Sequence, residues 1–403
     1  MINKRIRERK SSIMKLFKKN KDGITLIALV LSIILILILA GVSISSLIGQ
    51  NGILNRTIEA VKKTNEAALD EKIKMIIANY NIEKTFNSNL TFKKFCEKNE
   101  NNLEGLKIID ENSSKDIQFI AEIDNRLFIM KNNGSYVLTK GKNLVRNGFG
   151  ENGNTNFEIF DLKNNAFTMT KDSDYQGPIT SDFIEVDTNK KYYESINSRS
   201  NNSEATYYEG IIEYDIDKNY IEPCHYLYTE NTLTYLSKDL KDGDTEIYLN
   251  SLEGFNTKDI REEIDSGLIF WNYKDSTGYE YPELTYSRNV FFDLFNSEND
   301  FDLNENKIIL KTPWNHGNIE KGVKVSQCSS WATYNYGLMS GDTLTNEYKY
   351  HENYIEGVNE KNERSMTKFR PATKYIKILM LINYNQIPNV TTDIKNVIFA
   401  EMN

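Results

Sequence analysis

The chain has few of the residues that build metal and redox sites. Its three cysteines, Cys96, Cys224 and Cys328, are far apart, and none of its three histidines lies four residues from another. Since no CxxC pair occurs either, zinc motifs and dithiol redox motifs have no support. Cys224 and Cys328 are the two cysteines that a disulfide within one domain would join. Three unpaired thiols are the alternative.

Motifs for catalysis are missing as well. The sequence contains no Gly-x-Ser-x-Gly, no Walker loop, no dinucleotide fingerprint and no His-Glu-x-x-His. Acidic residues are numerous enough to supply the carboxylate pair of a glycoside hydrolase, but no motif singles out two of them. We therefore expect a protein that is not an enzyme.

A net positive charge marks the first 22 residues. Residues 1–22 hold nine Lys and Arg against Glu8 and Asp22, a net charge of +7. Because the whole chain carries −8, the rest carries −15. Such an acidic remainder argues against nucleic acid as a partner.

A long apolar run follows this basic segment. No charged residue lies between Gly23 and Arg56, and residues 24–48 are strongly apolar. About 25 helical residues at about 1.5 Å each extend roughly 37 Å, enough to cross a hydrocarbon core of about 30 Å. The basic residues in front of the run favour a cytoplasmic N-terminus, so the residues after Ile48 are expected outside the cell. We expect a single-pass protein of the cell membrane.

The junction between the two segments resembles a known processing signal. Lys19-Asn-Lys-Asp-Gly23 followed by Ile24-Thr-Leu-Ile-Ala28 is similar to the prepilin signal of type IV pilins and pseudopilins. The resemblance implies cleavage between Gly23 and Ile24 by a prepilin peptidase and methylation of the new N-terminus. It makes residues 1–23 a leader and residues 24–48, with Ile24, Leu26, Ala28 and Leu39, the membrane anchor.

One position departs from the family. The fifth mature residue of these pilins is usually a glutamate that pairs with a neighbouring subunit, and here it is Ala28. A carboxylate in lipid is costly unless it is paired, so its loss favours a free anchor over a filament. Assembly by packing alone, a minor or tip subunit of a pilus or secretion system, and a protein that never polymerises all stay open.

Residues 49–140 have the pattern of a small pilin-like head. Apolar residues at helical spacing predict an amphipathic helix to about Lys84, and a short helix is expected over 91–98. Three strands then follow, with turns at Asp124-Asn125 and Asn132-Asn-Gly134. The result is one antiparallel sheet beside the helices.

Residues 141–403 predict a mainly β domain. Short β-type segments alternate with turns, and helical periodicity is nearly absent, as in a β-sandwich or jelly roll. The predicted fold class is therefore α+β: a long N-terminal helix, the small head, and a large sandwich.

Part of this region resembles carbohydrate-binding jelly-roll modules. The resemblance is carried by Asn143-Leu-Val-Arg-Asn-Gly-Phe-Gly150, by Phe183-Ile-Glu-Val-Asp-Thr-Asn-Lys-Lys-Tyr192 and by Tyr214-Asp-Ile-Asp-Lys-Asn219. Leu236–Leu249 and Ser287–Asn289 are similar to segments of phage tail fibres and bacterial surface proteins. The resemblance implies a glycan or another surface component as ligand.

Aromatic residues beside asparagines are the candidate ligand contacts, because sugar rings present apolar faces that stack on Trp and Tyr. The candidates lie in three short stretches: Trp271, Tyr273, Trp314, Trp331, Tyr334 and Tyr336. A place in the sandwich core is the alternative for each tryptophan.

Metal binding has a weaker basis. Asp300-Phe-Asp-Leu-Asn-Glu-Asn306 spaces oxygen ligands at alternate positions but lacks the glycine and the final glutamate of an EF-hand loop. We expect a solvated acidic turn, no cofactor, and at most a structural calcium elsewhere.

The sequence thus predicts a membrane-anchored, pilin-like surface protein for adhesion or assembly, whose β-domain binds a glycan or another surface ligand. A non-filamentous surface protein, and a glycan-active enzyme with a targeting β-module, are the alternatives.

Overall fold

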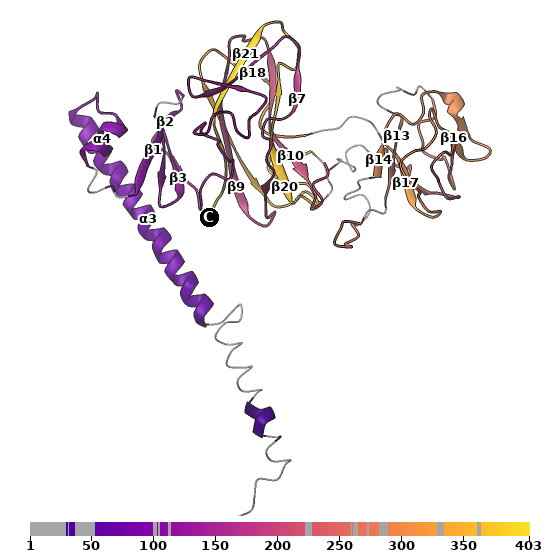
Figure 1. Ribbon diagram of the computed structural model, residues 1–403, viewed down its shortest axis with the longest axis horizontal. Helices are drawn as coiled ribbons and strands as arrows, with labels where there is room; N and C mark the ends of the chain where they lie inside the picture. The colour runs from indigo at the N-terminus through magenta and orange to yellow at the C-terminus, as the bar shows by residue number, and fades with distance from the viewer. Residues whose placement is uncertain are drawn as a thin grey trace, which may run out of the picture. The chain divides into compact units, whose positions relative to one another are not determined.

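The computed structural model describes residues 30, 32–36, 53–99, 103, 105–111, 114–221, 228–258, 260, 265–271, 274–281, 289–328, 334–360 and 364–403. The chain divides into two compact units, Met1–Phe95 and Cys96–Asn403. Most of the described secondary structure is β, in several antiparallel sheets, as the sequence predicts for its larger part (Figure 1).

The first unit is dominated by the helix α3 (Ile53–Phe86). Leu69, Ile73, Ile76 and Tyr80 recur every three or four residues and are buried, which confirms the predicted amphipathic face. The Tyr80 ring packs edge-on against Phe92 of the short helix α4 (Phe92–Lys98), with 5.2 Å between the ring centroids.

The predicted membrane anchor lies almost entirely outside the described residues. Only Val30 and residues 32–36 of the apolar run are described, and they are helical. Among the helices of the described part, none is long and apolar enough to cross a membrane. Gly23, Ile24, Leu26, Ala28 and Leu39 fall outside this part.

The second unit begins with a four-stranded antiparallel sheet in the order β1-β2-β3-β4. Its strands are β1 (Leu106–Glu111), β2 (Ile117–Ile123), β3 (Arg126–Lys131) and β4 (Tyr136–Leu138). The predicted turn at Asp124-Asn125 is confirmed, with both residues at positive φ. The prediction of three strands missed β1, an edge strand whose charged residues weaken its apolar pattern.

This small sheet packs on the outer surface of a larger sheet. Ile117, Ile120 and Ile129 share a buried cluster with Tyr193 and Ile398. Charged contacts join the same two sheets: Lys131 pairs with Glu352, Lys395 Nζ lies 3.1 Å from Asp110 Oδ2, and the Asn396 amide donates to that oxygen at 2.6 Å.

The largest element is a pair of five-stranded sheets. One has the order β19-β9-β21-β6-β5, and the other has β18-β10-β20-β7 with β8 paired to β20. The strands are β5 (Asp161–Lys163), β6 (Ala166–Lys171), β7 (Tyr175–Pro178), β8 (Ile184–Glu185), β9 (Lys191–Ser200), β10 (Thr206–Tyr214), β18 (Asn335–Thr343), β19 (Lys349–Glu356), β20 (Tyr375–Ile382) and β21 (Val390–Glu401). Both sheets contribute to one core, so they form a sandwich.

The chain between β10 and β18 forms further β structure. Its elements are β11 (Thr234–Tyr235), β12 (Glu246–Tyr248), β13 (Gly267–Phe270), β14 (Asn289–Phe291), η2 (Glu298–Asp300), β15 (Phe301–Asp302), β16 (Lys307–Ile309) and β17 (Lys324–Cys328). They pair as β11-β17-β13-β14 and β12-β16-β15 around a separate core. We call the residues between β10 and β18 the insert.

The insert differs from the prediction of one sandwich over 141–403. Strand alternation shows that a segment is β, but it does not show which sheet the segment joins. The boundary between the two cores therefore has no local signal in the sequence.

Because the two cores are separate, a cavity in one should leave the other intact. Phe270→Ala, at a fully buried ring of the insert, should cost about 3–5 kcal/mol of unfolding free energy there. Hydrogen exchange of the detergent-solubilised full chain should show faster exchange in β13 and β17 with β9 and β21 unchanged. The exposed Leu303→Ala is the control, and equal loss of protection in both cores would contradict separate cores.

Candidate functional site

The sheet β18-β10-β20-β7 has one face in the core and another that is covered only in part. Alternation along β10 sends Tyr207 and Ile211 into the core, while Tyr208, Ile212 and Tyr214 belong to a separate cluster on the opposite face. Leu379 and Leu381 of β20 lie in this second cluster. This outer face is the candidate site.

Eight aromatic rings form a continuous series across this region, and we call them the aromatic row. Neighbouring ring centroids are 4.8 to 6.4 Å apart, within the range of favourable ring contacts. In spatial order the row is Tyr384, Tyr208, Tyr336, Tyr334, Tyr220, Tyr214, Phe183 and Tyr375.

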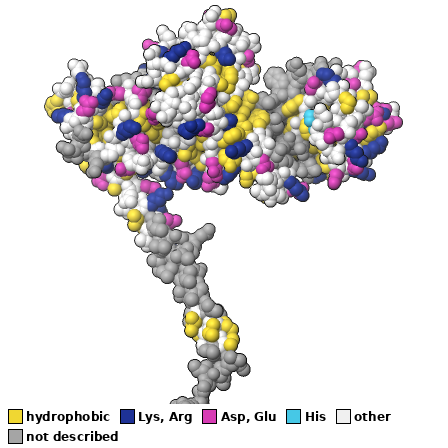
Figure 2. Space-filling view, viewed as in Figure 1, with side chains coloured by type: hydrophobic (Ala, Val, Ile, Leu, Met, Phe, Trp, Pro, Cys, Tyr) yellow, Lys and Arg dark blue, Asp and Glu magenta, His cyan; other side chains and the backbone are white. Residues whose placement is uncertain are grey.

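Most rings of the row are partly open to solvent. Tyr384 is 44% exposed, Tyr336 is 8% exposed, and the other six are half-buried. Figure 2 shows hydrophobic side chains gathered over the part of the sandwich where Figure 1 places β10 and β20. A half-buried tyrosine presents a rigid apolar face together with a hydroxyl. It therefore suits a ligand that has both apolar surfaces and hydrogen-bonding groups.

A β-bulge places Tyr336 in the row. Pairing between β10 and β18 shifts register between Glu209 and Ile211, opposite Asn335 and Met339. The bulge requires Gly210, because a Cβ there would lie 2.2 Å from the Asn335 carbonyl oxygen. Bulges commonly re-aim side chains beside functional sites.

Behind the bulge lies a buried hydrogen-bond network centred on Glu213. Its carboxylate accepts from the Asn335 amide, from the Arg370 backbone N–H at 2.7 Å and from the Thr373 hydroxyl at 3.2 Å. The Asn335 side chain also accepts from the Ser365 backbone N–H at 3.0 Å. This network fixes the first residue of β18, immediately before Tyr336.

A second buried polar group lies inside the sandwich beside the same bulge. A Cβ on Gly337 would lie 3.1 Å from Glu194 Oε2 and 2.3 Å from the Asn353 amide nitrogen. Glu194 and Glu209 are almost fully buried, and their carboxyl oxygens have no hydrogen-bond partner among the described residues. Burial is the main cause and the neighbouring Glu209 carboxyl the second, and together they raise the pKa of Glu194 to about 8 against the opposing effect of Asn353.

The structure brings together only two of the six predicted contact residues, Tyr334 and Tyr336. Trp271 is 5% exposed and its indole N–H donates to Ser326 at 2.8 Å. Trp314 is 2% exposed and its N–H donates to the Gly317 carbonyl at 2.6 Å. Both rings lie in cores of the insert, so neither offers a face to a ligand, contrary to the expectation for them. Tyr273 and Trp331 lie outside the described residues.

Sequence reasoning missed the other six rings of the row. The signal was available in part, since the alternation of Tyr207-Tyr-Glu-Gly-Ile-Ile-Glu-Tyr214 places Tyr208 and Tyr214 on one face of a strand. Phe183, Tyr220, Tyr375 and Tyr384 come from separate segments, and only the fold brings them to the same surface.

The acidic turn has ordinary local hydrogen bonds. Asp300 Oδ2 accepts from the Asn296 backbone N–H at 2.8 Å, while Asp302 Oδ1 accepts from the Asn304 backbone N–H at 3.0 Å. In the described part of the chain, no group of three or more His, Cys, Asp or Glu is arranged to hold a metal ion. Cys224 lies outside that part, so its pairing stays a prediction.

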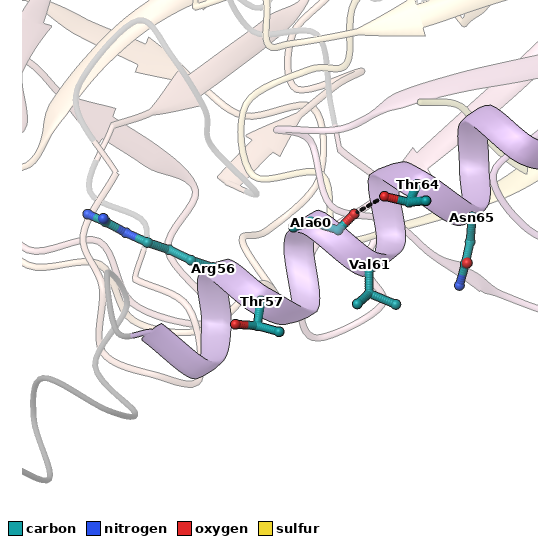
Figure 3. Close-up of a pocket in the computed structure, with 6 residues that line it drawn as sticks. All are labelled: Arg56, Thr57, Ala60, Val61, Thr64 and Asn65. Atoms are coloured by element: carbon teal, nitrogen blue, oxygen red, sulfur yellow. Dashed lines mark hydrogen bonds between the residues drawn. The ribbon is translucent and has the colours of Figure 1, made fainter.

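Two hollows elsewhere on the described surface lack a comparable group of aromatic rings. One is a shallow open surface on α3, where the Thr64 hydroxyl donates to the Ala60 carbonyl at 2.8 Å (Figure 3). Its lining residues are Arg56, Thr57, Ala60, Val61, Thr64 and Asn65. The other lies at one end of the sandwich, where Lys190 and Lys374 are paired with Glu401 and Glu185.

The raised pKa of Glu194 gives a test of the interior beside the bulge. A pKa above the ordinary value of 4.5 means that the folded state keeps a proton that the unfolded state loses, so stability should fall as pH rises from about 4.5 to about 8. Glu194→Gln should reduce this slope and gain stability relative to wild type at pH 8 more than at pH 5. Denaturant unfolding at several pH values measures both, with the exposed Glu151→Gln as control. An unchanged slope would contradict a protonated Glu194.

No known protein family matches the chain, and no similar protein was found among curated proteins or among solved structures.

Proposed function

We propose that this protein is a pilin-like surface protein, anchored in the cell membrane by residues 24–48, whose sandwich binds a glycan through the aromatic row. The observation that carries the binding function is the row itself, eight adjoining rings from strands and loops that are distant in sequence. A row of partly exposed rings suits successive sugar units better than a single small molecule.

The strand order supports a jelly roll as the finer fold assignment. From β6 onward the strands of the sandwich are β6, β7, β9, β10, β18, β19, β20 and β21, apart from the two-residue β8. The sheets β19-β9-β21-β6 and β18-β10-β20-β7 have the interleaved strand order expected of a double Greek key. In this assignment the insert is one long loop between the fourth and fifth strands.

The pilin-like part of the proposal is supported by sequence and by local structure. The Gly23-Ile24 junction and the apolar run carry the sequence resemblance, and α3 extends the same pattern as an amphipathic helix of 34 residues. A short helix and a small antiparallel sheet follow in the chain. We propose adhesion or assembly at the cell surface as the role, with prepilin peptidase and other pilin or secretion-system subunits as partners.

The processing proposal predicts the mature N-terminus. Mass spectrometry of protein from the native membrane should find a chain that begins at a methylated Ile24. Gly23→Val should leave residues 1–23 attached, because it adds a bulky side chain at the cleaved bond, where glycine presents bare backbone to the peptidase. Wild-type protein that retains Met1 in the membrane would remove the prepilin assignment.

The binding proposal predicts which tyrosines matter. Tyr384→Ala and Tyr208→Ala should each weaken glycan binding by about ten-fold, the effect of removing about 1.4 kcal/mol of contact energy. Tyr279→Ala is the matched control, since Tyr279 is 58% exposed and lies in the insert, outside the row. Binding of the full chain to immobilised neutral and acidic polysaccharides measures the effect. Equal binding by all three variants would contradict a role for the row.

A further inference from the structure

Three cations lie over rings of the aromatic row. The Lys377 Nζ is 4.3 Å from the centroid of Phe183, and Lys218 Nζ is 5.0 Å from the same ring. Beside Tyr336, near the opposite end of the row, the Arg364 guanidinium carbon is 4.5 Å from the ring centroid. These cation–ring contacts place three positively charged groups at the surface where a stacked ligand would bind.

None of the three cations forms an ion pair with a carboxylate of the described residues, and Arg364 donates instead to the Ser340 hydroxyl at 2.7 Å. The carboxylate that acts on the pKa of Lys377 is Asp182. Asp182 is itself paired with Arg146, which donates to both carboxylate oxygens, with 2.9 Å between Arg146 Nη2 and Asp182 Oδ1. Burial lowers the pKa of Lys377, and Lys218 lowers it further, against the opposing effect of Asp182. Unpaired positive charge is therefore concentrated here, in a chain with a net charge of −8.

The local backbone holds Lys218 in place. Lys218 has a φ of +62°, a conformation that few residues other than glycine adopt. The turn is held by Asp215, whose Oδ1 accepts from the backbone N–H groups of Asp217 and Asn219, each at 2.9 Å. The Lys218 N–H itself donates to the Asp215 carbonyl at 3.0 Å. A strained turn thus directs a lysine over the ring of Phe183.

We propose that the ligand of the aromatic row is an anionic glycan, whose sugar rings stack on the tyrosines while its acid groups bind Lys218, Lys377 and Arg364. This inference rests on the proposed glycan-binding function and narrows it to one class of glycan. Carboxylates of uronic acids and phosphates of sugar-phosphate polymers share the required chemistry. Cations at both regions of the row fit a polymer with repeated charges better than a ligand with one terminal charge.

The test compares a carboxylate polymer with its uncharged ester and adds a second polymer that carries phosphate. The full chain in nanodiscs of neutral lipid is tested against polygalacturonate, against its methyl ester, and against a phosphomannan. Binding to at least one charged polymer should exceed binding to the ester, and it should weaken between about 50 mM and about 500 mM salt as ionic screening increases. The two charged polymers distinguish carboxylate from phosphate as the acid group.

Variants identify the cations. Lys377→Gln, Lys218→Gln and Arg364→Gln should each weaken binding by about five-fold and reduce its salt dependence. Lys163→Gln, an exposed lysine on β5 of the other sheet, is the matched control. Unchanged near-ultraviolet circular dichroism of each variant shows that the aromatic packing is intact.

The outcomes separate this inference from the proposed function. If neither charged polymer binds better than the ester, or if the three cation variants have no effect, the anionic ligand is overturned and glycan binding is left standing. Equal binding of a DNA duplex would also overturn it, because the site would then bind any polyanion. If no polysaccharide binds, or if Tyr384→Ala and Tyr208→Ala leave binding unchanged, the proposed function fails and this inference fails with it.

Discussion

The strands β10 and β20 have one face in the sandwich core and the other under the aromatic row, and the candidate site depends on this constraint. Side chains alternate across a strand, so each residue that fills the sandwich core fixes a neighbour on the outer face. Ile376 and Ile378 lie in the core, whereas Leu379 lies under the tyrosines of the outer face. The packing of the core therefore determines the positions of Tyr208 and Tyr214, because a shift of β10 by one residue would turn both rings inward.

Polar groups inside the sandwich refine this arrangement. The Glu213 network fixes Asn335, the residue before Tyr336, and Glu194 lies beside Gly337, the residue after it. Buried polar groups therefore flank Tyr336 along the chain. Buried carboxylates are expensive, and Glu194 avoids part of the cost by holding a proton.

Prediction from the sequence succeeded where the signal is local. The amphipathic pattern from Leu69 to Tyr80 located α3, and Asp124-Asn125 located a hairpin, because helix period and turn conformation depend on adjacent residues. It failed for Trp271 and Trp314, because the same residue types serve both as core and as ligand contacts. Of the predicted contact residues, Tyr334 and Tyr336 lie in the row, and the other six rings of the row were not predicted.

The sequence by itself determined the kinds of segments in this chain: a basic start, an apolar run, an amphipathic helix and many short strands. Tertiary structure alone decided that the sandwich and the insert have separate cores, that the insert interrupts the sandwich after β10, and that Tyr384 lies beside Tyr208. The physical reason is that periodicity records which face of a segment is apolar. Which other segment covers that face depends on pairings between residues that are distant in sequence, such as Tyr208 with Leu381.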